Sequence, residues 1–230
     1  MLLHIFFTKC PFELEKCLDS TEYQRFNRFQ FEKERSEYAF AHSFKRHILS
    51  QNYPEKDKMT WQFFTNKNGK PFVKEPLSFN LSHSSGAVAL AVLKGNNQLN
   101  IGIDIEVYKK REDIAGLTKS VLHPTERNHL TTTPNINQGF LKIWTAKESL
   151  LKAVGCGLDD RLNTINCAAS LDDKPYKQYW RGKNYKIKTI CLGWGALSIC
   201  WQSDILIKDI SFIKIDNMDG ILYFDKVLTT

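Results

Sequence analysis

The stretch that decides the fold runs from residue 101 to residue 106 and reads Ile101-Gly102-Ile103-Asp104-Ile105-Glu106. Its apolar and acidic residues alternate, and the period-2 geometry of a β-strand places Asp104 and Glu106 on one face and the isoleucines on the other. Two carboxylates on one face can hold a cation, whereas a strand face with two solvated acids is the simpler alternative. The stretch therefore predicts a strand with a candidate metal site.

A helix is predicted downstream of this strand, from Phe140 to Val154. It contains Trp144, Glu148 and Lys152, which are spaced by four residues and so share one face. Glycines follow at 155 and 157 and stop the helix. The alternative is a helix packed on the core, with tryptophan as an apolar contact and glutamate and lysine as an ordinary surface pair.

Two polar stretches lie upstream of the strand. Gly69-Lys70-Pro71 has turn chemistry, and Asn80-Leu81-Ser82-His83-Ser84 ends a further predicted strand. Backbone amides and side chains at such turns can bind phosphate groups. An ordinary turn lysine and a polar strand end are the alternative interpretation.

The other elements favour an α+β fold, because strands come in runs rather than in strict β-α-β order. Ser20-Thr21 is expected to cap a helical region that ends near Asn52-Tyr53-Pro54, and Pro124 is expected to begin another helix. Further strands are predicted at 1–7, 61–64, 79–83, 87–92, 163–168, 176–180, 185–192 and 196–201, with a hairpin turn at 181–184.

Composition narrows the function classes. The chain has 230 residues, of which 42% are hydrophobic, so it can bury a sizeable core. The net charge of +7 suggests an anionic partner, but the basic residues are scattered and no nucleic-acid-binding signature is present. The sequence has no apolar run long enough to cross a bilayer, and its first residues read as a strand rather than a leader.

The six cysteines form no CxxC pair and show no zinc-ligand spacing against the six histidines. A reduced, cytoplasmic protein with structural cysteines is the expectation. The cysteines are Cys10, Cys17, Cys156, Cys167, Cys191 and Cys200.

Taken together, Gly69-Lys70-Pro71, the segment 80–84, the strand 102–106 and the helix segment 144–152 occur in the order and approximate spacing of one family. The sequence resembles the Sfp-like group of 4′-phosphopantetheinyl transferases. The resemblance implies an intrachain pseudo-dimer of two similar α+β halves, residues 1–99 and 100–230, with the active site in the cleft between them. It also implies a monomer, since a duplicated chain completes its own site.

The resemblance implies roles for individual residues. It assigns Mg²⁺ to the carboxylates of Asp104, Glu106 and Glu148. It assigns coenzyme A to Lys70, Ser82, His83, Arg46 and Lys152, with Arg28, Lys33 and Arg35 as further basic candidates. Its catalytic residues are Glu148 as general base, Lys152 as a charge-stabilising group and Lys147 as the second candidate base. Glu126 matches either a recurrent family acid or a favourable charge at a helix N-terminus.

The implied reaction moves 4′-phosphopantetheine from coenzyme A to a serine of an acidic apo carrier protein and releases adenosine 3′,5′-bisphosphate. Acyl carrier proteins of fatty acid or polyketide synthesis and peptidyl carrier domains all remain open. A nonenzymatic module that binds coenzyme A or a nucleotide on the same scaffold is the main alternative. A basic RNA-associated protein is a third, which the scattered charge supports little.

Overall fold

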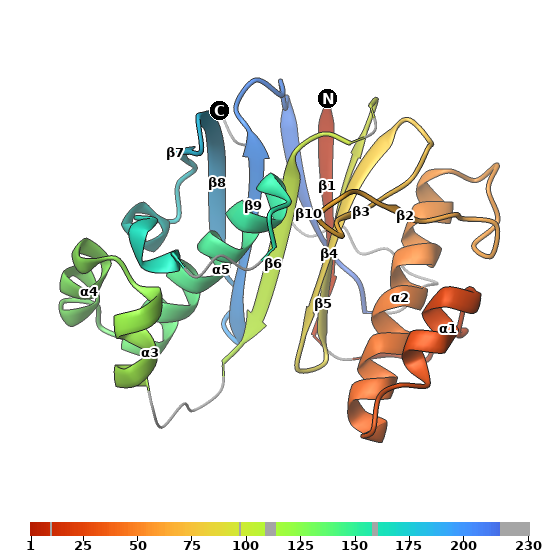
Figure 1. Cartoon of the computed structure of the whole chain (residues 1–230), viewed down its shortest axis with the longest axis horizontal. Coiled ribbons are helices and arrows are strands. Elements are labelled where there is room, and N and C mark those ends of the chain that lie inside the picture. Colours follow the sequence, from red (N-terminus) through yellow and green to blue (C-terminus); the bar gives the residue numbers. More distant parts are fainter. Residues whose placement is uncertain (10, 97, 109–113, 158–160, 217–230) are drawn as a thin grey trace.

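A computed structural model of the chain describes residues 1–9, 11–96, 98–108, 114–157 and 161–216. The strands are β1 (Leu2–Thr8), β2 (Phe64–Thr65), β3 (Pro71–Phe72), β4 (Leu77–Ser84), β5 (Ala87–Lys94), β6 (Ile101–Val107), β7 (Tyr176–Trp180), β8 (Lys183–Cys191), β9 (Gly195–Gln202) and β10 (Asp209–Lys214). The helices are α1 (Ser20–Phe26), α2 (Glu32–Asn52), α3 (Ile114–Val121), α4 (Pro124–Thr131) and α5 (Ile136–Val154). The α+β class is confirmed (Figure 1).

Two four-stranded sheets carry the fold, in the orders β10-β1-β5-β4 and β6-β9-β8-β7. Each contains the same connection pattern, in which a strand leads to a long helix and then to a hairpin whose second strand pairs antiparallel with the first. These are β1, α2, β4 and β5 in one sheet and β6, α5, β8 and β9 in the other. This repeated topology supports the predicted pseudo-dimer.

The predicted boundary at residues 99 and 100 falls between β5 and β6. Strand β10 belongs to the C-terminal half by sequence, yet it pairs in parallel with β1 in the first sheet. The chain therefore returns to the first sheet after the boundary, so the two predicted halves do not coincide with the two sheets. The division of the chain at this boundary stays a prediction.

Three apolar clusters form the core. The central cluster takes side chains from both sheets, including Ile5, Ile103, Ile105 and Ile199. A second cluster lies between α2 and the first sheet, and a third lies between α5 and the second sheet. Because the isoleucines of β6 enter the central cluster, its acidic residues face the side covered by α5, as the alternation predicts.

Several element boundaries follow from the residues at them. The turn between β7 and β8 lies at Arg181 and Gly182, both with positive φ, so the predicted hairpin is confirmed. Helix α4 begins at Pro124 after the cap His123, and α5 ends at Gly155, whose φ is +73°.

Three local predictions were wrong. Asp19, rather than Ser20 or Thr21, caps α1 by accepting the Glu22 N–H, and its helical region is two helices instead of one. The segment predicted as a strand at 163–168 instead carries 3₁₀ turns at Leu162–Thr164 and Ala168–Leu171. The strand predicted at 61–64 shrinks to β2, because Trp61 is buried against α2 and its indole bonds Ser50.

The described cysteines, at positions 17, 156, 167, 191 and 200, are all free thiols. The expectation of structural cysteines fits the three that are fully buried, whereas Cys10 lies outside the described residues. In the part of the chain that the structure describes, no helix is both long enough and apolar enough to cross a membrane.

Candidate active site

The polar face of β6 meets the end of β4, where the two sheets come together. The Ser82 hydroxyl donates to Asp104 Oδ1 over 2.9 Å, and the Ser84 hydroxyl donates to Glu106 Oε2 over 2.6 Å. The side chains of β4 thus hold the two carboxylates of β6 from the side of the first half.

Side chains of β4 also bond the backbone of β6, although backbone hydrogen bonds do not pair these two strands. The amide oxygen of Asn80 accepts the Ile103 N–H at 2.7 Å, and Ser82 Oγ accepts the Ile105 N–H at 3.4 Å. Asn80 was not among the predicted site residues, although it stands in the stretch that drew attention to Ser82. Alternate residues of β4 therefore satisfy the backbone of β6 and fix the junction.

Helix α5 lies close against β6 because residue 102 is glycine. A Cβ atom at this position would lie 2.1 Å from the Ser149 carbonyl oxygen and 2.3 Å from the Ala153 nitrogen. This approach brings the face of α5 that carries Glu148 and Lys152 over the acids of β6. The Lys152 ammonium lies 2.6 Å from Asp104 Oδ1 and donates to Ser82 Oγ at 2.9 Å.

These residues enclose a pocket of about 310 Å³. Its walls are Leu81, Ser82, His83, Asp104, Glu106, Trp144, Glu148 and Lys152. Six of the residues predicted to bind the metal or coenzyme A therefore meet there: Ser82, His83, Asp104, Glu106, Glu148 and Lys152. Trp144 both lines the pocket and stacks on Phe140, so it contributes to the wall as well as to packing.

The carboxylates of the pocket are not fully satisfied. Asp104 Oδ2 and Glu148 Oε1 are buried and have no hydrogen-bond partner among the described residues. Burial, and then the nearby negative charge of Asp104, raise the pKa of Glu148 to about 7. Burial also raises the pKa of Asp104, against the opposing effect of Lys152. Such a set of oxygens favours a bound cation or proton.

A second cavity of about 660 Å³ adjoins the pocket, and the two share Leu81 and His83. Its arginine and lysine side chains come from three places: Arg25 on α1, Arg28 just after α1 and Lys45 on α2. Lys45 also lies 3.5 Å from the ring centre of Phe63. Of the further basic candidates, Arg28 lies at this cavity, whereas Arg25 and Lys45 were not anticipated.

Arg46 does not reach either space, because its guanidinium is buried in an internal network. It donates to Asp19 Oδ2 at 2.5 Å and to Glu22 Oε2 at 2.8 Å, and also to the carbonyls of Lys58 and Trp61. The side chain is fully buried. The family resemblance assigned Arg46 to coenzyme A, and no pattern in the sequence reveals such an internal network.

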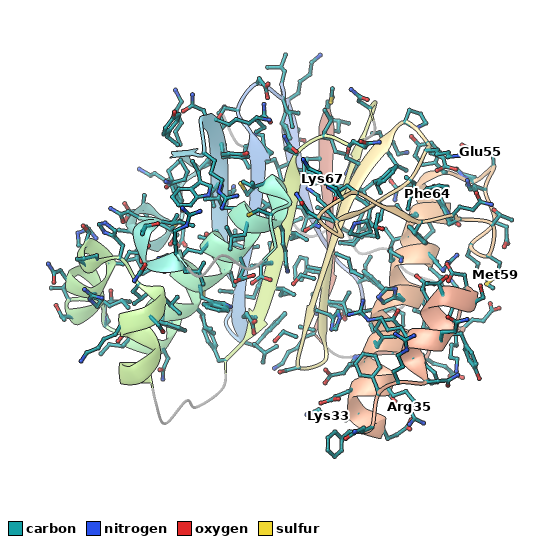
Figure 2. All side chains as sticks on the ribbon, in the orientation of Figure 1. Lys33, Arg35, Glu55, Met59, Phe64 and Lys67 are labelled. Carbon is teal, nitrogen blue, oxygen red and sulfur yellow. The ribbon has the colours of Figure 1, made fainter. Side chains whose placement is uncertain are left out.

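Lys33 and Arg35 also stay away from the pocket. Figure 2 shows both near the N-terminal end of α2, at the edge of the molecule. Arg35 pairs with Glu32 at 3.5 Å and donates to the Phe29 carbonyl. These contacts tie the start of α2 to the segment before it.

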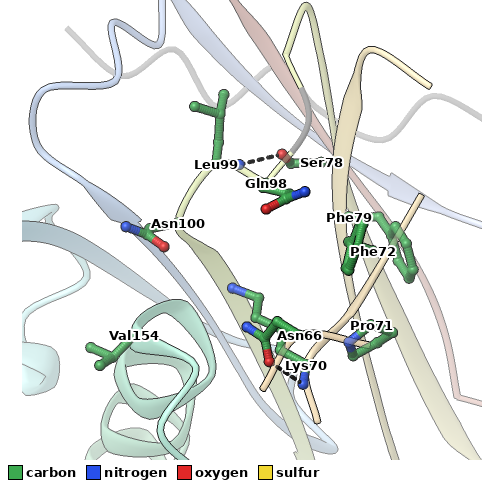
Figure 3. A pocket seen from close by; sticks show the side chains of 10 residues that line it. All are labelled: Asn66, Lys70, Pro71, Phe72, Ser78, Phe79, Gln98, Leu99, Asn100 and Val154. Atoms are coloured by element: carbon green, nitrogen blue, oxygen red, sulfur yellow. Dashed lines mark hydrogen bonds between the residues drawn. The ribbon is translucent and has the colours of Figure 1, made fainter. Parts of the chain in front are cut away.

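Lys70 lies at the junction between the sheets but does not line the carboxylate pocket. Its ammonium donates to the carbonyls of Ile101 at 2.8 Å and Ala153 at 3.2 Å, and so links β6 to the end of α5. It lines a small cavity of about 180 Å³ beside Asn66 and Asn100 (Figure 3). Burial lowers the pKa of Lys70 to about 8. Its role as a phosphate ligand stays a prediction, because its bonds here are structural.

Lys147 faces the core rather than the pocket. Its ammonium lies 2.6 Å from Glu126 Oε2 and donates to the carbonyls of Val121 and Leu162. Glu126 in turn accepts the backbone N–H groups of His123 and Cys167. Glu126 therefore serves as the helix-capping acid, and the pair ties α4 to α5.

Residues 100–195 match a family model described as the 4′-phosphopantetheinyl transferase superfamily. Over these residues, which make up less than half of the chain, the sequence is similar to that superfamily.

Several curated relatives are named as phosphopantetheinyl transferases. The chain is 33% identical over 153 residues to 4′-phosphopantetheinyl transferase HetI of Nostoc, which covers 64% of this chain and 63% of the relative. It is 32% identical over 105 residues to the transferase gsp of Aneurinibacillus migulanus, covering 45% and 42%. The Schizosaccharomyces pombe L-aminoadipate-semialdehyde dehydrogenase-phosphopantetheinyl transferase is 28% identical over 158 residues, covering 62% and 61%. The chain thus spans less than two thirds of each of these relatives.

The superfamily match maps onto the second sheet and its helices. It includes β6 and α5, and hence Asp104, Glu106, Glu148 and Lys152. Ser82 and His83 lie before it, on β4 of the first sheet. The pocket therefore combines the matched region with side chains from the preceding half.

Proposed function

We propose that the chain is a 4′-phosphopantetheinyl transferase that uses coenzyme A and Mg²⁺ to modify a serine of an apo carrier protein. One observation carries the proposal: Asp104, Glu106, Glu148 and Lys152 line one pocket, and two buried carboxylate oxygens there have no hydrogen-bond partner among the described residues. The superfamily match and the adjoining basic cavity support it.

The residues present fit a magnesium ion. Mg²⁺ prefers oxygen ligands and is commonly held by one or two carboxylates together with substrate phosphates. In the described part of the chain, Asp104 Oδ2 and Glu148 Oε1 are buried in this pocket without hydrogen-bond partners, and Glu106 supplies a third carboxylate. When bound, the ion would supply positive charge to the phosphoryl oxygens. Burial, and then the nearby negative charge of Asp104, raise the pKa of Glu148, and a bound cation would offset both effects.

The basic cavity suits the nucleotide end of coenzyme A. Arg25 and Arg28 are exposed at its wall, and among the described residues neither forms an ion pair. Lys45 holds Glu22 and lies over Phe63, so its charge is partly neutralised. With the phosphate-bearing ribose in this cavity, the pyrophosphate would extend past His83 into the carboxylate pocket, because the two spaces share that residue.

The reaction joins the carrier serine Oγ to the β-phosphorus of coenzyme A and breaks the bond from that phosphorus to the bridging oxygen. Adenosine 3′,5′-bisphosphate leaves with the electron pair, and the serine proton passes to Glu148 directly or through water. Lys152 stabilises negative charge on the phosphoryl oxygens, and His83 donates to a phosphate. Glu148 is favoured over Lys147 as base because Lys147 bonds Glu126 in the core.

The net charge of +7 suits an acidic carrier protein, since opposite charges speed encounter. We propose a monomer in the cytoplasm, because both halves of one chain line the pocket and the described cysteines are free thiols. The carrier class stays open between acyl and peptidyl carriers.

Intact-mass spectrometry tests the proposal. An apo acyl carrier protein and an apo peptidyl carrier domain are each incubated with this protein, coenzyme A and Mg²⁺. We expect a mass gain of one phosphopantetheine on at least one carrier, abolished by EDTA. Coenzyme A binding by calorimetry without any mass gain on a broad panel of carriers would instead support the nonenzymatic binding module.

A further inference from the structure

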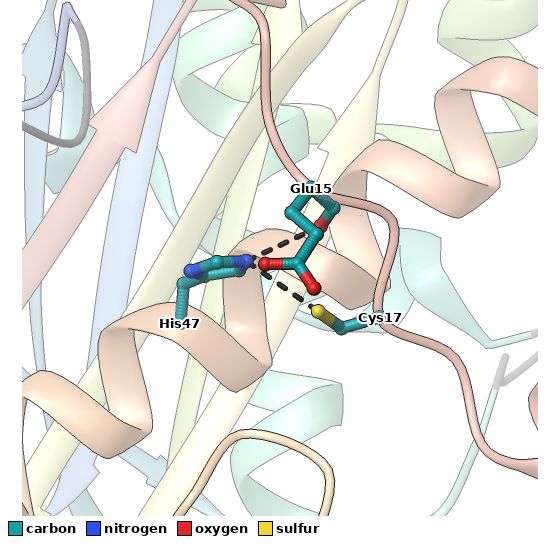
Figure 4. A group of neighbouring side chains, drawn as sticks. All are labelled: Glu15, Cys17 and His47. Atoms are coloured by element: carbon teal, nitrogen blue, oxygen red, sulfur yellow. Dashed lines mark hydrogen bonds between the residues drawn. The ribbon is translucent and has the colours of Figure 1, made fainter.

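A second group of ligand-type side chains lies away from the pocket, at Glu15, Cys17 and His47. Glu15 and Cys17 stand on the segment before α1, and His47 stands on α2 (Figure 4). His47 follows the cavity residue Lys45 by two positions, which is about 200° around a helix, so it points to the opposite side of α2. None of the three lines the active-site pocket or the cavity beside it.

The ligand atoms of these residues are close enough to share one metal ion. One carboxylate oxygen of Glu15, Cys17 Sγ and a ring nitrogen of His47 all lie within 4.8 Å of one another. Cys17 Sγ is 3.6 Å from His47 Nε2. A tetrahedral zinc ion with bonds of about 2.3 Å to sulfur and 2.0 Å to nitrogen separates those atoms by about 3.5 Å. Without a metal, His47 Nε2 contacts Cys17 Sγ and also the Glu15 carbonyl oxygen at 3.2 Å, so the protein's own contacts already hold the three residues together.

The three side chains differ in exposure, so the site opens to solvent on one side. Cys17 is fully buried, His47 is half-buried and Glu15 is exposed, so an ion enters from the Glu15 side and keeps a position open to water. The backbone around Cys17 is fixed, because its N–H donates to Ser43 Oγ of α2 at 2.9 Å. Two of the three ligands are thus held by the fold before any metal arrives.

One neighbouring charge competes with a metal. The Lys58 ammonium bonds Glu15 Oε2, which leaves the second carboxylate oxygen for a metal. A thiolate and a carboxylate together balance the charge of a divalent ion, and sulfur with imidazole nitrogen selects zinc over magnesium. Lys58 therefore lowers metal affinity without removing a ligand.

We propose that Glu15, Cys17 and His47 form a zinc site with three protein ligands and one open position. The site is separate from the magnesium site of the proposed transferase. Zinc there cross-links the segment before α1 to α2. Arg25 of α1, Arg28 just after α1 and Lys45 of α2 line the basic cavity, so the zinc site braces the elements that carry them. Sequence spacing missed it because Cys17 and His47 are 30 residues apart and only the return of α2 brings them together.

Cobalt titration of the untagged full chain tests the site, with Mg²⁺ in excess to occupy the carboxylate pocket. Cobalt bound to a thiolate in tetrahedral geometry gives a sulfur-to-metal absorption band and intense visible bands. We expect one cobalt per chain and displacement by an equivalent of zinc. No thiolate band at stoichiometric cobalt, or a band that persists in Cys17→Ser, would overturn the proposal.

Matched variants sharpen the test. His47→Gln should weaken zinc binding at least about tenfold, whereas His129→Gln, at an exposed histidine on α4, should not. Cys156→Ser is the corresponding control for Cys17→Ser, and His47→Gln keeps the proposal testable if loss of the buried thiol unfolds the chain. Lys58→Met should strengthen zinc binding severalfold because it removes the competing ammonium. Unchanged affinity in both His47→Gln and Lys58→Met would contradict the assignment.

Discussion

Helix α5 carries two lysine–carboxylate pairs that share a distance but have different surroundings. Lys147 lies 2.6 Å from Glu126, and Lys152 lies 2.6 Å from Asp104. The first pair is fully buried, whereas the Lys152 side chain is 30% exposed at the pocket. The two lysines are five residues apart, so they point to different sides of the helix.

The two pairs differ in how far the polar atoms around them are hydrogen-bonded. Around Lys147, two backbone carbonyls accept its remaining hydrogens, and both Glu126 oxygens accept backbone N–H groups. Around Lys152, Asp104 Oδ2 and Glu148 Oε1 are buried without partners among the described residues. A closed pair holds helices together, and an open pair leaves oxygens for a ligand. Distance within an ion pair therefore does not identify an active site.

The largest expected effect comes from breaking the closed pair. Lys147→Met leaves the Glu126 charge buried and should lower the free energy of unfolding by about 3–5 kcal/mol. Urea unfolding measures it. Adding Glu126→Gln should restore part of the loss, since it removes the unpaired buried charge while the single amide oxygen still accepts one of the two backbone N–H groups. Full wild-type stability of the single variant would show that the pair does not hold the fold.

Glu148→Gln should act on turnover instead of stability. Removing the charge of this carboxylate should reduce transfer by about 100-fold or more, because it loses both a metal ligand and the proton acceptor. Glu34→Gln, at an exposed glutamate in the first turn of α2, is the control and should keep the rate. Wild-type turnover of Glu148→Gln at saturating Mg²⁺ would refute both roles.

The open pair also depends on how closely α5 approaches β6. Gly102→Ala places a methyl group against the backbone of Ser149 and Ala153, so the helix must shift. We expect a loss of about 1–3 kcal/mol in unfolding free energy, together with slower transfer. Gly139→Ala on the same helix meets mainly the side-chain ends of Leu130 and Thr133 and should cost less. Equal effects of the two variants would argue against a special role for Gly102.

The smallest expected effect is a pH dependence of metal binding. Because the pKa of Glu148 is raised to about 7, its proton competes with Mg²⁺ below that pH. Affinity measured by calorimetry should rise about tenfold from about pH 6 to about pH 8 in the wild type, and Glu148→Gln should lose most of this slope. Equal affinities at both pH values in the wild type would contradict the raised pKa.

The same shift has a consequence for stability without metal. The folded protein holds the Glu148 proton more tightly than the unfolded chain, whose ordinary pKa is 4.5. This carboxyl's contribution to the unfolding free energy is therefore present below that value and declines as pH rises through about 7.

The sequence predicted the open pair well, because its residues follow simple periodicities. Alternation in β6 placed Asp104 and Glu106 together, and four-residue spacing on α5 placed Glu148 and Lys152 on one face. The residues that hold these elements in place were less visible. Asn80 and Gly102 act through backbone contacts between distant segments, and no local pattern encodes such contacts.

Buried ion pairs are the feature that the sequence reveals least. Lys147 and Arg46 have the side chains of ligand-binding residues, yet both are enclosed by partners from remote parts of the chain. Residues next to a motif can also face away, since one step along a helix turns a side chain by about 100°.

The most direct test compares the two lysines in one assay. Rates of phosphopantetheine transfer, followed by intact mass of the carrier, are measured for Lys152→Met and for the double variant Lys147→Met, Glu126→Gln, at a temperature where both are folded. We expect at least about a 100-fold lower rate for Lys152→Met and a rate near wild type for the double variant. A normal rate for Lys152→Met, or a loss confined to the double variant, would contradict it.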